Sequence, residues 1–431
     1  MSWLAVAVLV VSFVALLAIG VPIAFCLGIS TTLTMLLSAD GLAAVTAVAQ
    51  RMATGVDSFT LLAIPFFVLA GQLMNQGGIA RRLVDFAKAM LGMLPGALAF
   101  VNVLAAMLFG AVSGSAVAAA SAVGGFMGPQ MKKEGYDKNF SAAVNITSAS
   151  TGLIIPPSNV LIVYSLAAGG VSIGALFLAG YLPGLLVGLS LMVVAAIWAY
   201  RYDYPTSDRV SLSTALWRFV EAIPSLFMLV VVIGGIVAGI FTATEAAAVA
   251  VLYAFLLALV YREIDWADLH AVLLDTVNTS AIVLLLVGAS IAMSWVLSYE
   301  QIPQGVAASL VALTDSTWGL LLIINVLLLV VGTFMDITPA VLIFTPIFLP
   351  IVTELGIDPI HFGIIIVLNL CVGICTPPVG TLLFVGAAVG DTTITRLIRP
   401  LLPLYVAMVV SLLLVTYLPF LSLWLPRVFG F

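Results

Sequence analysis

Long apolar runs alternate with short polar segments along the chain, and the length of these runs predicts its elements. Ten runs are long enough to cross a membrane as helices, since one crossing needs about 20 apolar residues. They lie near 3–20, 22–38, 60–76, 139–168, 174–200, 222–240, 245–261, 272–298, 362–389 and 401–424. The composition agrees, because 63% of the residues are hydrophobic and only 8% are charged, against about 25% charged in soluble domains. The pattern predicts an all-α polytopic membrane protein and excludes a soluble enzyme.

The basic residues predict how the chain is oriented. In a ten-span arrangement, 12 of the 14 lysines and arginines fall on one side, and only Arg51 and Arg427 fall on the other. The 12 form five clusters: Arg81, Arg82 and Lys88; Lys132, Lys133 and Lys138; Arg201, Arg209 and Arg218; Arg262; Arg396 and Arg399. The positive-inside rule makes that side cytoplasmic and places both termini outside. The net charge of −5 offers no footprint for nucleic acid.

A sequence repeat divides the chain into two halves. At a constant offset of 221 residues Pro129 matches Pro350, and Gly152-Leu-Ile-Ile-Pro-Pro matches Gly373-Ile-Cys-Thr-Pro-Pro. Each half contains five spans, and three lysines lie in one of two equivalent loops and none in the other. An odd number of spans and this asymmetry predict inverted repeats, which are typical of secondary transporters. The predicted repeats are 1–205 and 215–431.

Two apolar stretches, 93–129 and 316–353, are expected to be re-entrant helical hairpins. The first has basic residues on both flanks, so the chain must enter the membrane and return on the same side. Its centre reads Gly110-Ala-Val-Ser-Gly-Ser115, and the centre of the second reads Gly332-Thr-Phe-Met-Asp-Ile-Thr-Pro339. The arms of the first are short for a hydrocarbon core of about 30 Å. Non-helical tips at that depth must be buried in protein or line a wet cavity.

The spans 139–168 and 362–389 each contain a Gly-x-x-x-Pro-Pro element, which should break the helix because proline removes a backbone donor and clashes with the preceding turn. Freed carbonyls beside hydroxyls would suit a small cation, and the new half-helix N-termini would suit a carboxylate. The nearby hydroxyls are Ser148, Ser150, Thr151, Ser158 and Thr376. A simple proline kink is the alternative. Two elements in register, each paired with a hairpin, favour a binding site.

Single polar residues add candidate chemistry. Asp336 is the only charged residue between Asp315 and Glu354. A carboxylate at mid-membrane costs about 2.5–3.5 kcal/mol, which favours a functional cation ligand over a protonated helix N-cap. Ser113 and Ser115 fit either a binding site or a small-residue helix contact. At the start of another span, Thr242-Ala-Thr-Glu245 predicts a capping box.

Several motifs together resemble one known family. They are Ile64-Pro-Phe-Phe-Val-Leu-Ala-Gly71, Ser113-Gly-Ser115, Ile155-Pro-Pro-Ser158, Thr242-Ala-Thr-Glu245, Met335-Asp336 and Thr376-Pro-Pro-Val-Gly380. In this order the chain resembles the large membrane subunit of tripartite ATP-independent periplasmic (TRAP) transporters, the DctM- and SiaM-like proteins. The resemblance implies an elevator-type, sodium-driven transporter of the ion transporter superfamily in the bacterial inner membrane. It also implies two partners: a separate small four-helix membrane subunit, and a periplasmic binding protein that delivers an organic acid such as a carboxylate or sialic acid.

The resemblance also implies where the ligands bind. The sodium sites of the family lie between each hairpin tip and the adjacent broken helix. In this chain the matching positions are Ser113, Ser115, Gly152 and Ile155 in the first half, and Asp336, Thr338, Gly373 and Thr376 in the second. The expected substrate contacts are Ser115, Ser158, Asn159 and Thr381. Sodium is the coupling ion, and no other cofactor is expected.

Two other functions stay open at this stage. A stand-alone sodium/anion symporter would have the same architecture without needing a binding protein. A passive channel would need neither sodium nor saturable binding, and paired closed hairpins argue against it. No nucleotide-binding G-x-x-x-x-G-K-[ST] motif occurs in the sequence. The identity of the organic acid is not encoded in any motif.

Overall fold

The computed structural model describes residues 3–76, 78–91, 96–202, 204, 212–311, 314, 316–377 and 379–431. Every regular element in these ranges is helical, which confirms the predicted all-α class. Residues 93–95 at the predicted start of the first hairpin, residue 205 at the predicted repeat boundary and Pro378 lie outside the described residues.

The helices of the two halves follow one another in similar order. The first half contains α1 (Trp3–Ala18), α2 (Ile23–Met35), α3 (Gly41–Val56), the 3-10 helix η1 (Phe59–Leu62), α4 (Ala63–Gln76), α5 (Ile79–Leu91), α6 (Ala97–Ser113), α7 (Ala116–Lys133), α8 (Lys138–Thr151), α9 (Asn159–Ala167) and α10 (Ile173–Arg201). The second half contains α11 (Leu212–Val237), α12 (Ala243–Tyr261), α13 (Trp266–Tyr299), α14 (Ile302–Val311), α15 (Thr317–Phe334), α16 (Ile337–Glu354), α17 (Pro359–Gly373), α18 (Thr381–Val389), α19 (Ile394–Tyr417) and α20 (Phe420–Val428).

Eight of the described helical segments are long and apolar enough to cross a membrane. They are Phe59–Gln76, Ile173–Arg201, Leu216–Val237, Ala243–Tyr261, Asp268–Tyr299, Thr317–Phe334, Ile337–Glu354 and Ile394–Tyr417. Shorter apolar helices, among them α1, α2 and α17, accompany them. The lengths and the apolar composition of these helices are therefore consistent with the predicted multi-pass membrane protein.

The arms of the first hairpin are longer than its apolar stretch suggested, whereas those of the second nearly fill the predicted stretch 316–353. Helix α7 continues through Pro129 as far as Lys133, so its charged last turn extends beyond the uncharged run. Helices α15 and α16 have 18 residues each, or about 27 Å at 1.5 Å per residue. By length alone these two arms could cross a membrane, so their re-entrant placement stays a prediction.

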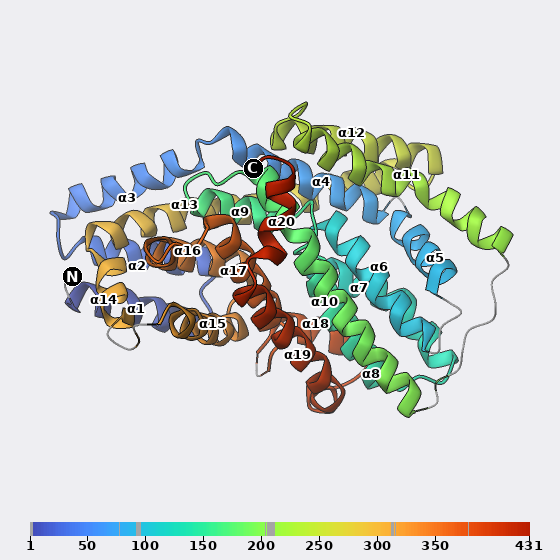
Figure 1. Cartoon of the computed structure of the whole chain (residues 1–431). Coiled ribbons are helices and arrows are strands. Elements are labelled where there is room, and N and C mark those ends of the chain that lie inside the picture. The colour runs from blue at the N-terminus through green and yellow to red at the C-terminus, as the bar shows by residue number, and fades with distance from the viewer. Residues whose placement is uncertain are drawn as a thin grey trace.

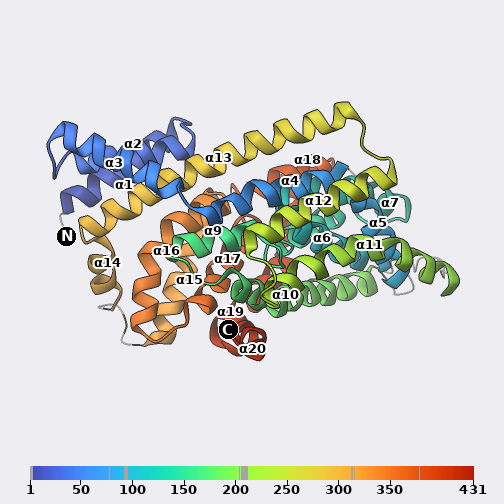
Figure 2. The ribbon, with the colours of Figure 1, turned by 90° about the horizontal axis from the view of Figure 1, so that it is seen from above.

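The helices pack into two groups that meet at α4, which contacts α6 and α9. In the first group α1 packs on α2 and α2 on α3, while α2, α3 and α4 all pack on α13, and α4 also packs on α12. Helices α6 to α10 pack with one another and with α17 to α19. Figures 1 and 2 both show α1, α2 and α3 at one end of the molecule and α5 and α11 at the other, with α9, α16 and α17 between them. Helix α13 runs along most of the length of the molecule in Figure 2.

Glycine pairs bring each hairpin against its broken helix. A Cβ atom built on Gly152 would lie 2.6 Å from the Cα of Gly110, and one built on Gly373 would lie 2.6 Å from the Cα of Gly332. Only glycine allows two backbones to approach this closely. The same contact therefore fixes α6 on α8 in the first half and α15 on α17 in the second.

Candidate transport site

A cavity of about 210 Å³ lies where the two hairpin tips meet the two broken helices. Its lining includes Ser113, Ser115 and Asn159 from the first half, and Asp336, Thr338 and Thr381 from the second. These six residues are all among the positions predicted for ligands. The cavity is smaller than the roughly 300–1,000 Å³ of drug-sized ligand sites, so it suits a small ligand.

Four helices begin at this cavity. The lining contains residues from the first turns of α7, α9, α16 and α18. A helix N-terminus carries unsatisfied N–H groups and a partial positive charge, which stabilises an anion nearby. The cavity therefore combines a positive backbone potential with one carboxylate, that of Asp336.

Asp336 occupies the N-cap position of α16, but its side chain does not cap the helix. The residue is exposed and lines the cavity. Among the described residues no lysine, arginine or histidine forms an ion pair with it. The backbone N–H of Ile337 is a hydrogen-bond partner of this carboxylate, which leaves further lone pairs for a ligand, and the cation-ligand interpretation stays a prediction.

The tip of the first hairpin is more fully hydrogen-bonded. The hydroxyl of Ser115 accepts a hydrogen bond from the backbone N–H of Ala118 at 3.2 Å, which caps α7. The hydroxyl of Ser113 donates to the carbonyl of Ser115 over a long 3.4 Å. Between them Gly114 has a φ of +62°, a left-handed conformation that glycine adopts without strain.

Asn159 faces this tip from the start of α9. A Cβ atom built on Gly114 would lie 2.6 Å from the amide nitrogen of Asn159, so the two residues are in direct contact. The side-chain oxygen of Asn159 is buried and has no hydrogen-bond partner in the described part of the chain. An unpaired amide oxygen at a cavity is available to a ligand donor, since buried polar groups normally find one.

The remaining predicted residues lie in the bends of the broken helices and do not line the cavity. Ser158 is fully buried, and its hydroxyl donates to the carbonyl of Leu153 at 2.5 Å. The hydroxyl of Thr376 donates to the carbonyl of Val372 at 2.8 Å. Gly152, Ile155 and Gly373 can offer only backbone oxygens, and the first and last of them form the glycine contacts described above.

Some backbone carbonyls that the helix breaks were expected to leave unpaired accept other hydrogen bonds. The carbonyl of Leu153 accepts from Ser158, that of Gly373 accepts from the N–H of Thr376 at 2.8 Å, and that of Ile374 accepts from the N–H of Leu382 at 3.3 Å. Hydrogen bonds within the bends pair part of the backbone, because an unpaired carbonyl in a buried site costs free energy. A carbonyl oxygen has two lone pairs, so each can still accept one ligand.

Two long helices supply lining residues that the sequence analysis did not identify. Ile64 and Val68 come from α4, and Thr279 and Val283 come from α13. Three of the four are apolar and look like ordinary membrane-helix residues in the sequence. Thr279 had a weak signal, because it is a polar residue in the middle of a predicted span.

A comparison with solved structures first identifies the class of fold. The structure is similar to that of the YdaH transporter of Alcanivorax borkumensis, with a TM-score of 0.64 and 16% identity over 88% of each chain. At this identity the likeness concerns the fold alone.

The family follows from the sequence. Residues 10–421 match the model of the DctM component of tripartite ATP-independent periplasmic transporters, and the chain belongs to this family. It is 44% identical to the C4-dicarboxylate TRAP transporter large permease protein DctM of Pseudomonas aeruginosa, over 94% of each chain. It is 40% identical to the sialic acid TRAP transporter large permease protein SiaM of Vibrio cholerae, over 96% of each. It is 56% identical to the uncharacterised YgiK of Salmonella typhimurium, over 97% of this chain and 96% of that one. The predicted family is confirmed, and the chain is a membrane transporter subunit.

Proposed function

We propose that this permease takes up a small organic acid together with sodium, at the cavity between the hairpin tips and the broken helices. The observation that carries the proposal is the position of Asp336 among the N-termini of four helices. A carboxylate favours a cation, and helix N-termini favour an anion. A site that offers both within about 210 Å³ can bind the two together, and that is the physical requirement for coupled transport.

The proposed sodium ligands are oxygen atoms on both sides of the cavity. In the second half they are the carboxylate of Asp336, the hydroxyls of Thr338 and Thr376, and the carbonyl of Gly373. In the first half they are the hydroxyls of Ser113 and Ser115 and the carbonyls of Gly152 and Ile155. Hard cations prefer such oxygen ligands. The support is that four of these residues line the cavity and the others lie in the bends beside it.

The proposed substrate is a small organic acid. Its acidic group would face the helix N-termini, with polar contacts from Ser115, Asn159 and Thr381. Ser158 caps α9 and would act through that helix, since its own hydroxyl is engaged. The names of relatives support the class, because they describe transport of C4-dicarboxylates, sialic acid and 2,3-diketo-L-gulonate.

The proposed mechanism is an elevator built from two inverted repeats. The hairpins and broken helices would move as one body against α4 and α13, which also line the cavity. The recurrence of the glycine contact in both halves supports the repeats. The partners of this family would be a small four-helix membrane subunit and a periplasmic binding protein. The charge distribution supports placing both termini in the periplasm.

The test is uptake by proteoliposomes that contain the permease and the small subunit. Labelled C4-dicarboxylate, sialic acid and diketogulonate are supplied with their binding proteins, under an inward sodium gradient or with potassium replacing sodium. We expect saturable uptake of one acid only with both binding protein and sodium. Uptake without the binding protein would favour the stand-alone symporter, and non-saturable flux independent of sodium would favour a channel.

A further inference from the structure

The largest of the cavities described, of about 750 Å³, lies away from the transport site at one end of the helix bundle. Its lining comes from the start of α15, the turn between α16 and α17, the end of α19 and helix α20. Because α15, α17 and α20 begin here and α16 and α19 end here, we expect the cavity to lie where the helices meet the lipid headgroups. The lining includes the carboxylate of Asp358, the imidazole of His361 and the guanidinium of Arg427.

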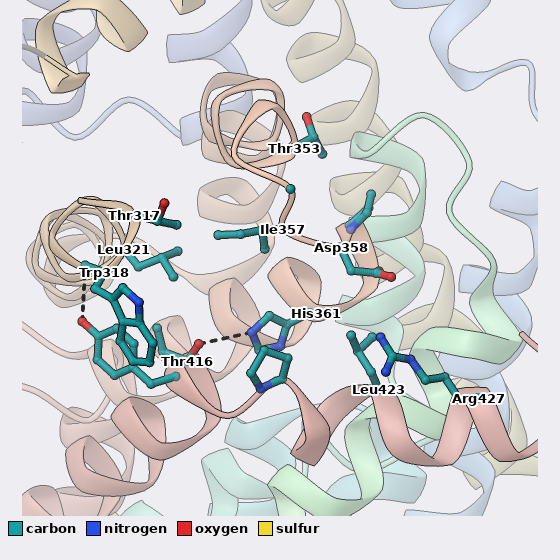
Figure 3. Close-up of a pocket in the computed structure, with 14 residues that line it drawn as sticks. Thr317, Trp318, Leu321, Thr353, Ile357, Asp358, His361, Thr416, Leu423 and Arg427 are labelled. Carbon is teal, nitrogen blue, oxygen red and sulfur yellow. Dashed lines mark hydrogen bonds between the residues drawn. The ribbon is translucent and has the colours of Figure 1, made fainter. Parts of the chain in front are cut away.

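The buried histidine is a structural residue of this cavity. His361 is 2% exposed, and its two ring nitrogens contact the hydroxyl of Ser422 at 2.5 Å and the carbonyl of Thr416 at 3.2 Å. Both nitrogens are therefore used within the protein. Figure 3 shows His361 between Trp318 on one side of the cavity and Asp358 and Arg427 on the other.

The two remaining charged groups are not paired with each other. Asp358 caps α17 by accepting a hydrogen bond from the N–H of Ile360 at 2.7 Å, which uses one carboxylate oxygen. Arg427 is exposed on α20. Among the described residues neither side chain forms an ion pair. The cavity is thus lined by one arginine and one carboxylate that form no ion pair within the described part of the chain, and Figure 3 draws both on the same side of His361.

The opposite rim of the cavity is aromatic and leads to an apolar surface. Trp318 stacks on Tyr417 with ring centroids 4.8 Å apart, and the hydroxyl of Tyr417 donates to the carbonyl of Trp318 at 3.0 Å. Such amphipathic rings are typical of the membrane interface. On α15 an exposed stripe continues from Trp318 at every fourth residue: Leu322, Val326, Val330 and Phe334. This stripe is about 24 Å long, longer than the roughly 15 Å of one hydrocarbon leaflet.

We propose that this cavity binds the headgroup of a zwitterionic phospholipid, phosphatidylethanolamine. Arg427 binds the phosphate, and the free oxygen of Asp358 accepts from the primary ammonium group. The acyl chains leave past Trp318 and lie along the stripe of α15. The carboxylate of Asp358 would repel an anionic headgroup that has no amine. The site therefore selects a headgroup that carries both a positive and a negative charge.

The test is native mass spectrometry of the purified chain titrated with dioleoyl phosphatidylethanolamine or dioleoyl phosphatidylglycerol. We expect one high-affinity site that prefers the ethanolamine lipid about tenfold, the equivalent of one charge-assisted hydrogen bond. Soluble glycerophosphoethanolamine at the same concentration should not displace it, because it lacks the acyl chains. Equal binding of the two lipids would show ordinary annular lipid and overturn the proposal, as would displacement by the soluble headgroup.

Variants locate the site. Asp358→Asn keeps a good N-cap residue and should bring the ratio of the two affinities close to one. Arg427→Gln should weaken both lipids, whereas the control Arg51→Gln, an exposed arginine elsewhere in the chain, should change neither. If both test variants behave like the control, the proposal is wrong. A loss of binding-protein contact without any change in lipid binding would instead mark a protein docking site. If a variant does not fold, the comparison of the two lipids on the unaltered chain still decides.

Discussion

Asp336 combines an N-cap position with a carboxylate that does not cap its helix. If this carboxylate binds sodium, the folded protein gains stability in proportion to the logarithm of the sodium concentration above the dissociation constant, about 2.7 kcal/mol at one hundred times that constant. We expect sodium chloride, compared with potassium chloride, to raise the melting temperature of the detergent-solubilised chain, and Asp336→Asn to abolish the rise. Differential scanning fluorimetry measures both.

The matched control for this prediction is Asp40→Asn. Asp40 also occupies an N-cap position, that of α3, without a side-chain capping bond. Asparagine is as good an N-cap as aspartate, so neither variant should lose helix stability. A sodium response that persists in Asp336→Asn, or disappears in Asp40→Asn, would remove Asp336 from the proposed ligands.

The glycine contacts give a second prediction at the residue scale. Gly152→Ala and Gly373→Ala each place a methyl group 2.6 Å from a backbone Cα atom, which cannot yield as a flexible side chain would. We expect each variant to lose about 1–3 kcal/mol of stability, as overpacked cores do. Thermal unfolding of the purified chain measures the loss. Gly128→Ala in α7, where a Cβ meets nothing within 4 Å, should unfold at the temperature of the unaltered chain or above.

Candidate functional residues could be predicted from the sequence where a polar residue interrupts an apolar stretch. Asp336 was identified because it is the one charge in a long apolar stretch, and the structure shows its carboxylate without a capping bond. The capping box of Thr242 and Glu245 is confirmed, with the carboxylate of Glu245 accepting from the N–H of Thr242 at 2.8 Å. Ile64 and Val68 could not be identified, because an apolar residue that lines a cavity has the same sequence signature as one that faces lipid.

At the scale of the elements, glycine and proline predicted where helices end. Helix α8 ends at Thr151 and α17 ends at Gly373, directly before the two Pro-Pro elements. The lengths of the hairpin arms were less predictable, because a charged residue ends an apolar run without ending a helix. Lys132 and Lys133 lie in the last turn of α7, where they complement its negative end.

The contact between α4 and the tip of the first hairpin gives a prediction at this scale. A Cβ atom built on Gly71 would lie 2.8 Å from the carbonyl oxygen and 3.0 Å from the Cα of Ser113, so the backbone of the hairpin tip rests directly on α4. If the hairpin moves against α4, this contact must separate and re-form in each transport cycle, and Gly71→Ala, which crowds it, should lower the rate of uptake in proteoliposomes.

The control for this variant lies between α3 and α13, outside the proposed moving body. A Cβ atom built on Gly55 would lie 2.9 Å from the Cβ of Ile291, so Gly55→Ala crowds a helix contact to a similar degree. It should leave the rate of uptake unchanged. Uptake by Gly71→Ala as fast as that by Gly55→Ala would contradict the elevator proposal.

At the scale of the whole molecule, the sequence contained the repeat but not the way its halves meet. A constant offset identifies equivalent residues, whereas the interfaces depend on which surfaces are complementary. In the structure the second arm of each hairpin packs against a half-helix of the other half, α7 against α18 and α16 against α9. This exchange brings Ser115 and Thr381 to one cavity, although they lie far apart in the sequence.

The proposed inverted orientation of the two halves predicts opposite exposure of equivalent loops. Lys133 and Glu354 are separated by the repeat offset, and both are exposed at the ends of equivalent hairpin arms. If both termini lie in the periplasm, as proposed, a membrane-impermeant maleimide should label Glu354→Cys in intact cells and Lys133→Cys only after lysis. Labelling of both positions from the same side would contradict the inverted repeat.

The most direct measurement is substrate uptake driven by sodium alone. Proteoliposomes with the permease, the small subunit and the loaded binding protein are prepared with sodium outside, on both sides, or inside only. Sodium coupling through Asp336 predicts accumulation above the external concentration only with the inward gradient, and its loss in Asp336→Asn. Equal accumulation in all three conditions, or unchanged accumulation in Asp336→Asn, would contradict it.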